Sequence, residues 1–302
     1  MNKVRQPVTV LPVPFHYGAS RLGASGGPEA VLQAGLLEKL RHLNLTHTIY
    51  PWKEPADYAT DRRSLERMRN WGRVLTMSEA VAAAVQAITE SEAFPLTIGG
   101  DHSVSIGTIA GVTAHIQQLG VIWIDAHADM NTPQTSHTGN LHGMALAAGL
   151  GLGDARFTEL LGRSPKLQPK RIVLVGVREL DEGEKKHIYE SGITCFTMHD
   201  IDRIGMGRVM EKAIAIASYG SEGIHVSFDI DSVDPGEAPG TGTPVRGGLN
   251  YREAHLAMEM LFDCGMVTSA DLVEVNPLLD TNGRTARLAV ELIGSLLGER
   301  IL

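Results

Sequence analysis

Short apolar runs rich in valine and isoleucine recur along the chain and alternate with segments of helical spacing. The runs are nearly continuous rather than alternating, which is typical of strands buried on both faces. This pattern predicts strands at 8–13, 95–98, 121–124, 172–177, 193–196, 224–228 and 267–275. Apolar positions at helical spacing predict helices at 28–43, 77–89, 103–119, 205–218, 251–264 and 284–297. Because strand and helix alternate, we expect a parallel sheet with helices on both faces, and periodicity alone leaves a closed eight-stranded barrel as the alternative.

No repeat, low-complexity tract or linker divides the 302 residues, so one domain over residues 1–302 is expected. Three long irregular stretches stand out, at 131–143, 151–170 and 231–248. The first and third directly follow predicted strands. Long loops in a compact domain usually carry function, and these two are expected at the carboxyl edge of the sheet, where open α/β folds bind ligands.

Composition narrows the class of protein. The chain is 43% hydrophobic and 21% charged, with a formal charge of −8 and no long run of lysine or arginine, which argues against nucleic acid as a partner. No segment approaches the ~20 apolar residues that span a bilayer. Pro7, Pro12 and Pro14 interrupt the apolar stretch near the start, so we expect no signal peptide and a cytoplasmic protein without a membrane partner. Cys195 and Cys264 are expected to be reduced thiols.

Ionisable residues cluster directly after three of the predicted strands. Asp125, His127 and Asp129 follow the run at 121–124, and residues two apart leave a strand end on the same side. If they were ordinary loop residues, placing three ionisable side chains beside a buried strand would cost electrostatic free energy without a compensating role. Asp229 and Asp231 repeat this geometry after the run at 224–228.

A third cluster follows the run at 95–98, in Gly99-Gly-Asp-His-Ser103. The glycines permit a tight turn from strand to helix, so His102 can face the edge of the sheet. Asp101 has two interpretations, a helix cap or a metal ligand, and the structural role is slightly favoured.

Together these edges supply four aspartates and two histidines: His102, Asp125, His127, Asp129, Asp229 and Asp231. Four converging carboxylates repel one another by several kcal/mol, and no lysine or arginine lies within the motifs. Two divalent cations would cancel the four charges. Carboxylate oxygens favour Mn²⁺, with Fe, Co and Zn as alternatives, and a water shared by two such ions is a nucleophile at neutral pH.

These motifs resemble the ureohydrolases, the family that includes arginase and agmatinase, and the likeness is closest to arginase. It extends over most of the chain, from Gly18-Ala-Ser-Arg-Leu-Gly23 through Gly240-Thr-Gly-Thr-Pro244 to Asp271-Leu-Val-Glu-Val-Asn-Pro277. The resemblance implies a three-layer α/β/α sandwich with a mainly parallel central sheet, the arginase/deacetylase-like fold. It also implies two Mn²⁺ ions per subunit, the first held by His102, Asp125, Asp129 and Asp229 and the second by Asp125, His127, Asp229 and Asp231, with Asp125 and Asp229 bridging.

The resemblance also implies residues that bind the substrate. Asn131, Thr138 and Asn140 are similar to the loop that receives the α-carboxylate and α-amino group of an amino acid, and taken alone they would be an ordinary polar turn. Neutral amides and hydroxyls can bond a carboxylate without adding charge beside the metals. Asp181 and Glu184 resemble the acidic pair for the α-ammonium, although as isolated carboxylates they would more often start a solvated helix.

Three further residues complete the resemblance. His142 is similar to the mobile histidine that carries a proton to the leaving amine, and its ordinary pKa near ~6.5 suits that exchange. Glu274 resembles the carboxylate that grips the substrate guanidinium, with Thr243 nearby, and such a pair forms charge-assisted hydrogen bonds. Asp129 is expected to accept a proton from the nucleophile and to pass it on.

The family's usual loop differs here in places. His137 stands where serine or threonine is common, Thr138 replaces serine, and Ala145 follows Gly-Met where proline is frequent. These changes concern the substrate side chain rather than the metals. Leu302 follows the last predicted helix closely, so we expect no long tail of the kind with which some animal arginases bind neighbouring subunits. A homo-oligomer, trimer or hexamer, is expected.

The expected function is hydrolysis of L-arginine to L-ornithine and urea. Agmatinase, or an enzyme acting on another guanidino acid, is the alternative on the same metal site, and agmatine would not need the 131–142 loop because it lacks a carboxylate. A catalytically silent metal-binding or assembly subunit is the alternative from another class. The complete ligand set together with His142 and Glu274 argues against it.

Overall fold

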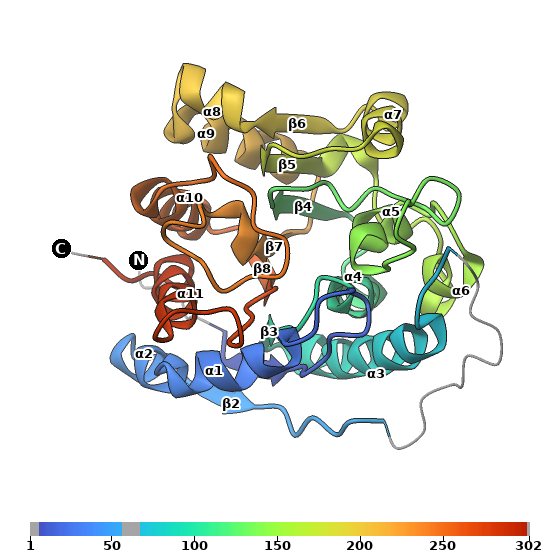
Figure 1. The fold of residues 1–302 in the computed structure, drawn as a ribbon. Helices are drawn as coiled ribbons and strands as arrows, with labels where there is room; N and C mark the ends of the chain where they lie inside the picture. Colours follow the sequence, from blue (N-terminus) through green and yellow to red (C-terminus); the bar gives the residue numbers. More distant parts are fainter. Residues whose placement is uncertain (1–5, 56–66, 301–302) are drawn as a thin grey trace.

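One open, fully parallel sheet of eight strands organises the chain. The computed structural model describes residues 6–55 and 67–300 (Figure 1). The strand order is β2-β1-β3-β8-β7-β4-β5-β6. The strands are β1 (Val8–Pro12), β2 (His47–Ile49), β3 (Phe94–Ile98), β4 (Leu119–Ile124), β5 (Ile172–Val177), β6 (Thr194–Thr197), β7 (Gly223–Asp229) and β8 (Val267–Val273). Because β2 and β6 are edges and each pairs with one strand, the barrel alternative is excluded.

Helices connect successive strands and cover both faces of the sheet. They are α1 (Gly27–Gln33), α2 (Leu36–His42), α3 (Trp71–Glu90), α4 (Val104–His115), α5 (Ala145–Gly149), α6 (Ala155–Thr158), α7 (Glu182–Ser191), α8 (Met198–Ile204), α9 (Met206–Ser218), α10 (Tyr251–Cys264) and α11 (Arg284–Leu296). Parallel strands need such crossovers because the chain must return to the same edge before each new strand begins.

Two hydrophobic cores lie on opposite faces of the sheet. Along β4, Ile122 and Ile124 point into the core shared with α9, α10 and α11, whereas Val121 and Trp123 point into the core shared with α3 and α4. Successive side chains of a strand face opposite sides, so a strand between two helical layers must be apolar throughout. Figure 1 shows α3 and α4 on one side of the sheet and α9, α10 and α11 on the other. The predicted three-layer α/β/α sandwich is confirmed.

Several predicted elements differ in their bounds. The helix expected over 28–43 is two helices, because Gly35 adopts a left-handed φ of 102° between them. The helix expected to reach Leu119 ends at His115, and Leu119 already begins β4. Neither α7 nor α8 was predicted; α7 has little apolar character, so its hydrophobic periodicity is weak. The strand β2 was also not predicted, because it has only three residues and two of them, Thr48 and Ile49, are exposed.

Both long loops that were expected to carry function leave the carboxyl ends of central strands. Residues 131–143 follow β4, and residues 231–248 follow β7. The strands β4 and β7 are neighbours in the sheet. Of the helices in residues 6–55 and 67–300, none is both long and apolar enough to cross a bilayer. Leu302, on which the expectation of a short C-terminus rests, lies outside the described residues.

Candidate metal centre and substrate cavity

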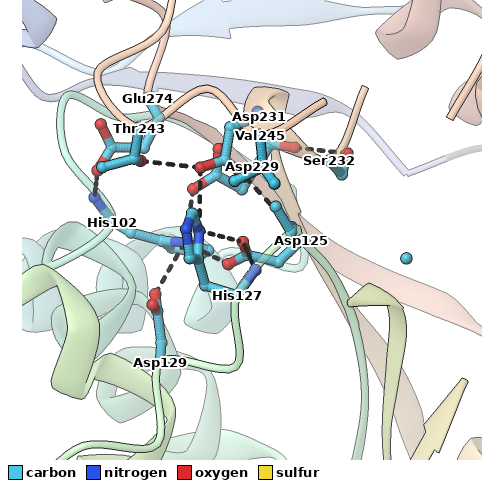
Figure 2. Close-up of polar contacts among 12 residues, drawn as sticks. His102, Asp125, His127, Asp129, Asp229, Asp231, Ser232, Thr243, Val245 and Glu274 are labelled. Carbon is cyan, nitrogen blue, oxygen red and sulfur yellow. Dashed lines mark hydrogen bonds and ion pairs between the residues drawn. The ribbon is translucent and has the colours of Figure 1, made fainter. Parts of the chain in front are cut away.

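Three strands of the sheet, β3, β4 and β7, bring the predicted metal ligands to one point. Asp125, His127 and Asp129 follow β4, Asp229 ends β7, and Asp231 lies in the single helical turn after it. His102 comes from the turn between β3 and α4. Figure 2 shows the four aspartates around the rings of His102 and His127. The carboxyl edge of the sheet therefore collects residues that are more than a hundred positions apart in the chain.

The ring of His102 faces three carboxylates. Its Nδ1 lies 3.1 Å from Asp125 Oδ2, 3.0 Å from Asp129 Oδ2 and 3.1 Å from Asp229 Oδ2. Adjacent ligands around an octahedral ion with bonds of about 2.1 Å are themselves about 3.0 Å apart. Although these atoms lie close together, within the described part of the chain neither His102 Nδ1 nor Asp129 Oδ2 makes a hydrogen bond of acceptable geometry. Buried polar atoms are normally satisfied, so this donor set fits a cation.

A second donor set surrounds the ring of His127. Its Nδ1 lies 3.4 Å from Asp125 Oδ1 and 3.2 Å from Asp231 Oδ2. Asp125 thus offers one oxygen to each histidine, and two groups of residues could hold a metal: His102 with Asp125 and Asp129, and Asp125 with His127 and Asp231. The second oxygen of Asp229 accepts the backbone N–H of Asp231, so its expected bridging role stays a prediction.

Without cations three of the four carboxylates are in an unfavourable setting, whereas His102 and His127 hold the pKa of Asp125 below its ordinary value. Burial raises the pKa of Asp229 well above its ordinary value, and the charge of Asp231 adds to the effect. Burial and the charge of Asp125 raise the pKa of Asp129 and of Asp231 as well. The site without metal therefore retains protons that divalent cations would displace, because metal ligands must be deprotonated.

Neighbouring groups hold the two histidines and the aspartates in place. The Trp123 ring stacks on His102 at 4.2 Å between centroids, and its Nε1 donates to Asp125 Oδ2 at 3.0 Å. Thr243 Oγ1 donates to Asp231 Oδ2 at 2.9 Å (Figure 2). Fixed neighbours of this kind orient metal ligands before an ion arrives.

Arg178, which holds a loop beside the site, was not singled out by the sequence analysis. Arg178 directly follows β5, and its guanidinium donates to the backbone carbonyls of Asp231, Ser232 and Val245. It therefore fastens the loop after β7 to the end of β5 and brings a cation beside the metal motifs. A charged residue directly after a buried strand was the signal that could have identified it.

A cavity of about 340 Å³ opens beside the metal centre. Its lining includes the expected residues Asn131, Thr138, His142, Asp181, Glu184 and Thr243, together with His127, Asp129 and Asp229. Among the described residues, Asn140 and Glu274 are not part of this lining. Asn140 instead accepts a hydrogen bond from Ser20 Oγ at 2.8 Å. A larger and mainly apolar cavity, about 420 Å³, lies at the opposite, amino edge of the sheet beside Val8, Phe94 and Val267, far from these groups.

Asp181 and Glu184 begin α7 and face the cavity at the same time. They form a capping box, in which each side chain accepts the other's backbone N–H. Asn131 Nδ2 also donates to Asp181 Oδ2 at 2.7 Å, which ties this helix to the loop after β4. Burial and the charge of Asp129 raise the pKa of Glu184 to about 7. The Glu184 carboxylate is therefore partly protonated near neutral pH, and a cation bound in the cavity would favour its ionised form.

His142, which lines the cavity, pairs with the buried Glu274. His142 Nδ1 lies 2.9 Å from Glu274 Oε1, which also accepts the backbone N–H of His102 at 2.9 Å. Burial acts to lower the pKa of His142, but Glu274 outweighs it and raises that pKa to about 9. Glu274 and Asp129 both have positive φ, 65° and 52°. Left-handed backbone at residues other than glycine is strained, and such residues concentrate at functional sites.

The turn that carries His102 is fixed by close backbone contacts. A Cβ atom at Gly100 would lie only 1.6 Å from the carbonyl oxygen of Phe15, so no larger residue fits. Asp101 is buried beside it and accepts the backbone N–H groups of Gly18 and Ser103. Asp101 therefore has the structural role, which the sequence analysis slightly favoured over ligation.

Comparisons with known proteins agree with this geometry. The model of the arginase family matches residues 6–298. An arginase of Bacillus caldovelox is 48% identical over 98% of this chain and all of the relative, and its solved structure superposes with a TM-score of 0.93. An arginase of Bacillus subtilis is 46% identical over 98% of this chain and 99% of the relative. The structure of an Entamoeba histolytica arginase in complex with L-ornithine is 34% identical, with a TM-score of 0.89 over 98% of this chain and 99% of that one. This chain belongs to the arginase family.

Proposed function

We propose that this chain hydrolyses L-arginine to L-ornithine and urea with two Mn²⁺ ions per subunit. The observation that carries the proposal is the pair of donor sets around His102 and His127, which share Asp125 and open on a cavity with polar walls. Relatives 40–48% identical to the chain are named arginase, and one solved relative holds L-ornithine, the expected product. The ions, when bound, would lower the pKa of a water molecule and stabilise negative charge that develops on the substrate.

In this proposal the residues of the chain divide the ligand roles as follows. His102, Asp125, Asp129 and Asp229 hold one ion, and Asp125, His127, Asp229 and Asp231 hold the other. Trp123, Thr243 and Arg178 keep these ligands in position. Oxygen-rich sites with few nitrogen ligands suit Mn²⁺ better than a structural zinc ion.

Proton transfer falls to two residues that face the cavity. Water adds its oxygen to the guanidinium carbon of the substrate, and Asp129 accepts the proton that this oxygen loses. His142 delivers a proton to the nitrogen that becomes the ornithine amine, and the bond between this nitrogen and the central carbon breaks. The proton left on the added oxygen is released as the urea carbonyl forms and restores His142. Asp129 passes its proton on to the ornithine amine, so both residues end as they began. Before substrate binds, Glu274 raises the pKa of His142 to about 9, so the substrate meets a protonated His142 at neutral pH, which is the state a proton donor needs.

The rest of the cavity holds the amino-acid end of the substrate. Asn131, Thr138 and Asn140 are proposed to hydrogen-bond the α-carboxylate, and Asp181 with Glu184 to face the α-ammonium. Glu274 is proposed to receive the guanidinium, which requires His142 to give up its bond to Oε1. Residues 1–302 are proposed to be one catalytic domain, since one sheet runs through all the described elements. We also propose that the protein is cytoplasmic, that it forms a homo-oligomer, either a trimer or a hexamer, and that it has no nucleic-acid partner.

Urea release from L-arginine by Mn²⁺-loaded protein tests the activity directly. Turnover of agmatine, measured in parallel, tests the alternative substrate, which lacks the carboxylate that Asn131 and Thr138 are proposed to bind. We expect arginine to be the better substrate by at least 10²-fold in kcat/KM. Protein that is folded and loaded with two ions but releases no urea from arginine would defeat the assignment.

A further inference from the structure

A chain of buried polar side chains runs away from the metal centre between β7 and β8. It begins at His102, whose Nε2 lies 2.9 Å from Ser227 Oγ, and continues from Ser227 Oγ to Asp271 Oδ1 at 2.6 Å. Asp271 Oδ2 lies 3.2 Å from His225 Nε2, and His225 Nδ1 lies 2.9 Å from Ser269 Oγ. All five residues are at most 1% exposed. The metal ligand His102 is thus connected to an acidic residue outside the donor sets.

The register of the two central strands builds this chain. Ser227 pairs with Asp271 and His225 pairs with Ser269 across the parallel ladder. The alternate positions of the same strands, among them Val226 and Ala270, are apolar and belong to the core on the other face. An ionisable pair at the centre of a sheet is costly to bury, and apolar residues there would stabilise a fold as well or better. This cost suggests that the pair serves the site rather than the sheet.

The hydrogens of the chain can be assigned one by one. A carboxylate only accepts, so His225 Nε2 and Ser227 Oγ must both donate to Asp271. Burial alone would raise the pKa of Asp271, but His225 and Ser227 outweigh it, and the group stays ionised. A serine hydroxyl has a single hydrogen, which Ser227 gives to Asp271. The oxygen of Ser227 is therefore left to accept, and His102 must carry its hydrogen on Nε2.

We propose that Asp271 is a positioning residue of the metal centre, which acts through Ser227 to hold His102 in the tautomer whose Nδ1 lone pair faces the first metal ion. His225 supports Asp271 by occupying its second oxygen. Without the carboxylate, the Ser227 hydroxyl could turn and donate to His102 Nε2. Hydrogen would then move to Nδ1, where it would point at Asp125, Asp129 and Asp229 instead of leaving room for a cation. The inference rests on the metal pair of the proposed function.

Metal affinity, measured by competition with a chelator, tests this role without reference to urea production. Partners of a metal-bound histidine typically account for 10–100-fold in affinity. We expect Asp271→Ala to lower the Mn²⁺ affinity of the site that contains His102 by that factor, and to leave the other site less affected. Ser227→Ala should cause a similar loss, and the double variant should lose no more than either alone, since the carboxylate acts through the hydroxyl.

A matched control exists in the other core. His255 Nδ1 lies 2.8 Å from Ser295 Oγ in a buried pair between α10 and α11 that does not reach the metal ligands. Ser295→Ala should leave both Mn²⁺ affinities unchanged. Asp271→Asn keeps the shape of the side chain but loses the charge, so this variant should fold even if Asp271→Ala does not. It should bind Mn²⁺ about 3- to 10-fold less tightly than the unaltered protein, because charge-assisted hydrogen bonds are roughly twice as strong as neutral ones.

The outcomes separate this inference from the proposed function. If the unaltered protein binds no Mn²⁺, the proposed metal centre itself is wrong. If it binds two ions and a folded Asp271→Asn protein binds them equally tightly, the positioning role is overturned and the metal centre stands. Losses that multiply fully in the double variant would also overturn the role, because they would show that Asp271 and Ser227 act independently.

Discussion

The metal centre and the outer wall of the cavity are built in different ways. The proposed ligands of the centre sit on or directly after central strands, and five of the six are at most 5% exposed. The outer wall comes from the loop after β4 and the start of α7, where Asn131, Asp181 and Glu184 also hold each other through hydrogen bonds. The centre is thus placed by the sheet, whereas the wall is placed by its own side chains.

This difference determines how ambiguous each residue is. Asp229 caps the single helical turn after β7 through one oxygen, but its other oxygen faces His102 among buried acids, and a cap alone does not explain that setting. Asp181 has a complete structural explanation as the cap of α7. Residues of the wall can therefore serve both the fold and the substrate, and only experiments that separate the two roles can assign them.

The largest effect is expected at the centre, from Asp129→Asn. The amide keeps the shape and can still approach a cation through its oxygen, but it cannot accept a proton from the nucleophile. We expect kcat to fall by about 10³-fold or more with L-arginine, consistent with loss of a general base. Metal analysis of the same sample is the control, and a variant with two ions and wild-type turnover would remove Asp129 from the mechanism.

The next effect is expected from His142→Asn, at the junction of centre and wall. Loss of the proton donor should lower kcat by about 10²-fold, while both Mn²⁺ ions remain bound. In the unaltered enzyme, kcat/KM, which reports the free protein, should decline as pH rises through about 9, because His142 beside Glu274 then loses its proton. The variant should lack this decline, and a preserved decline would assign it to another group.

A smaller effect, on KM, is expected at the wall from Glu184→Gln. A hydrogen bond to a charged group contributes about 1.5–3 kcal/mol, so KM for arginine should rise roughly 10-fold or more at pH 8. Because the pKa of Glu184 is raised to about 7, KM of the unaltered enzyme should increase between pH 8 and 6 as the carboxylate gains a proton. The glutamine variant should show no such increase.

The same raised pKa has a consequence for stability. The folded protein binds more protons at Glu184 than the unfolded chain between about pH 4.5 and 7, so this group's contribution to stability is lost as pH rises through that window. The Tm of metal-free protein, measured at pH 5 and at pH 8, should differ less between the two pH values in Glu184→Gln than in the unaltered protein.

The smallest effect separates capping from substrate binding at Asp181. Asn250 forms an equivalent capping box at the start of α10, and it is not among the residues that line the cavity. Asp181→Ala and Asn250→Ala should each lower the free energy of unfolding by about 1 kcal/mol. Only Asp181→Ala should also raise KM for arginine, and equal KM values in the two variants would reduce Asp181 to a cap.

The sequence alone determined a parallel sheet covered by helices and the metal motifs of this protein, and only the family resemblance within it favoured an open sheet over a barrel. Continuous apolar runs identified seven of the strands, because a strand between two helical layers has no polar face. Asp125, His127 and Asp129 were recognisable because three ionisable residues at this spacing directly after a buried strand are not expected of an ordinary loop. The short strand β2 and the polar helix α7 lacked such a signal.

Tertiary structure alone decided which distant residues meet. Arg178 contacts the loop after β7, Trp123 stacks on His102, and Asp271 bonds to Ser227. These contacts form only because β3, β8, β7, β4 and β5 are consecutive in the sheet, and that order is not written in local periodicity. Structure also separated Asn140 and Glu274 from the cavity lining, which the motifs had grouped with it. A motif fixes what a side chain can do, whereas packing over long sequence separations fixes what it faces.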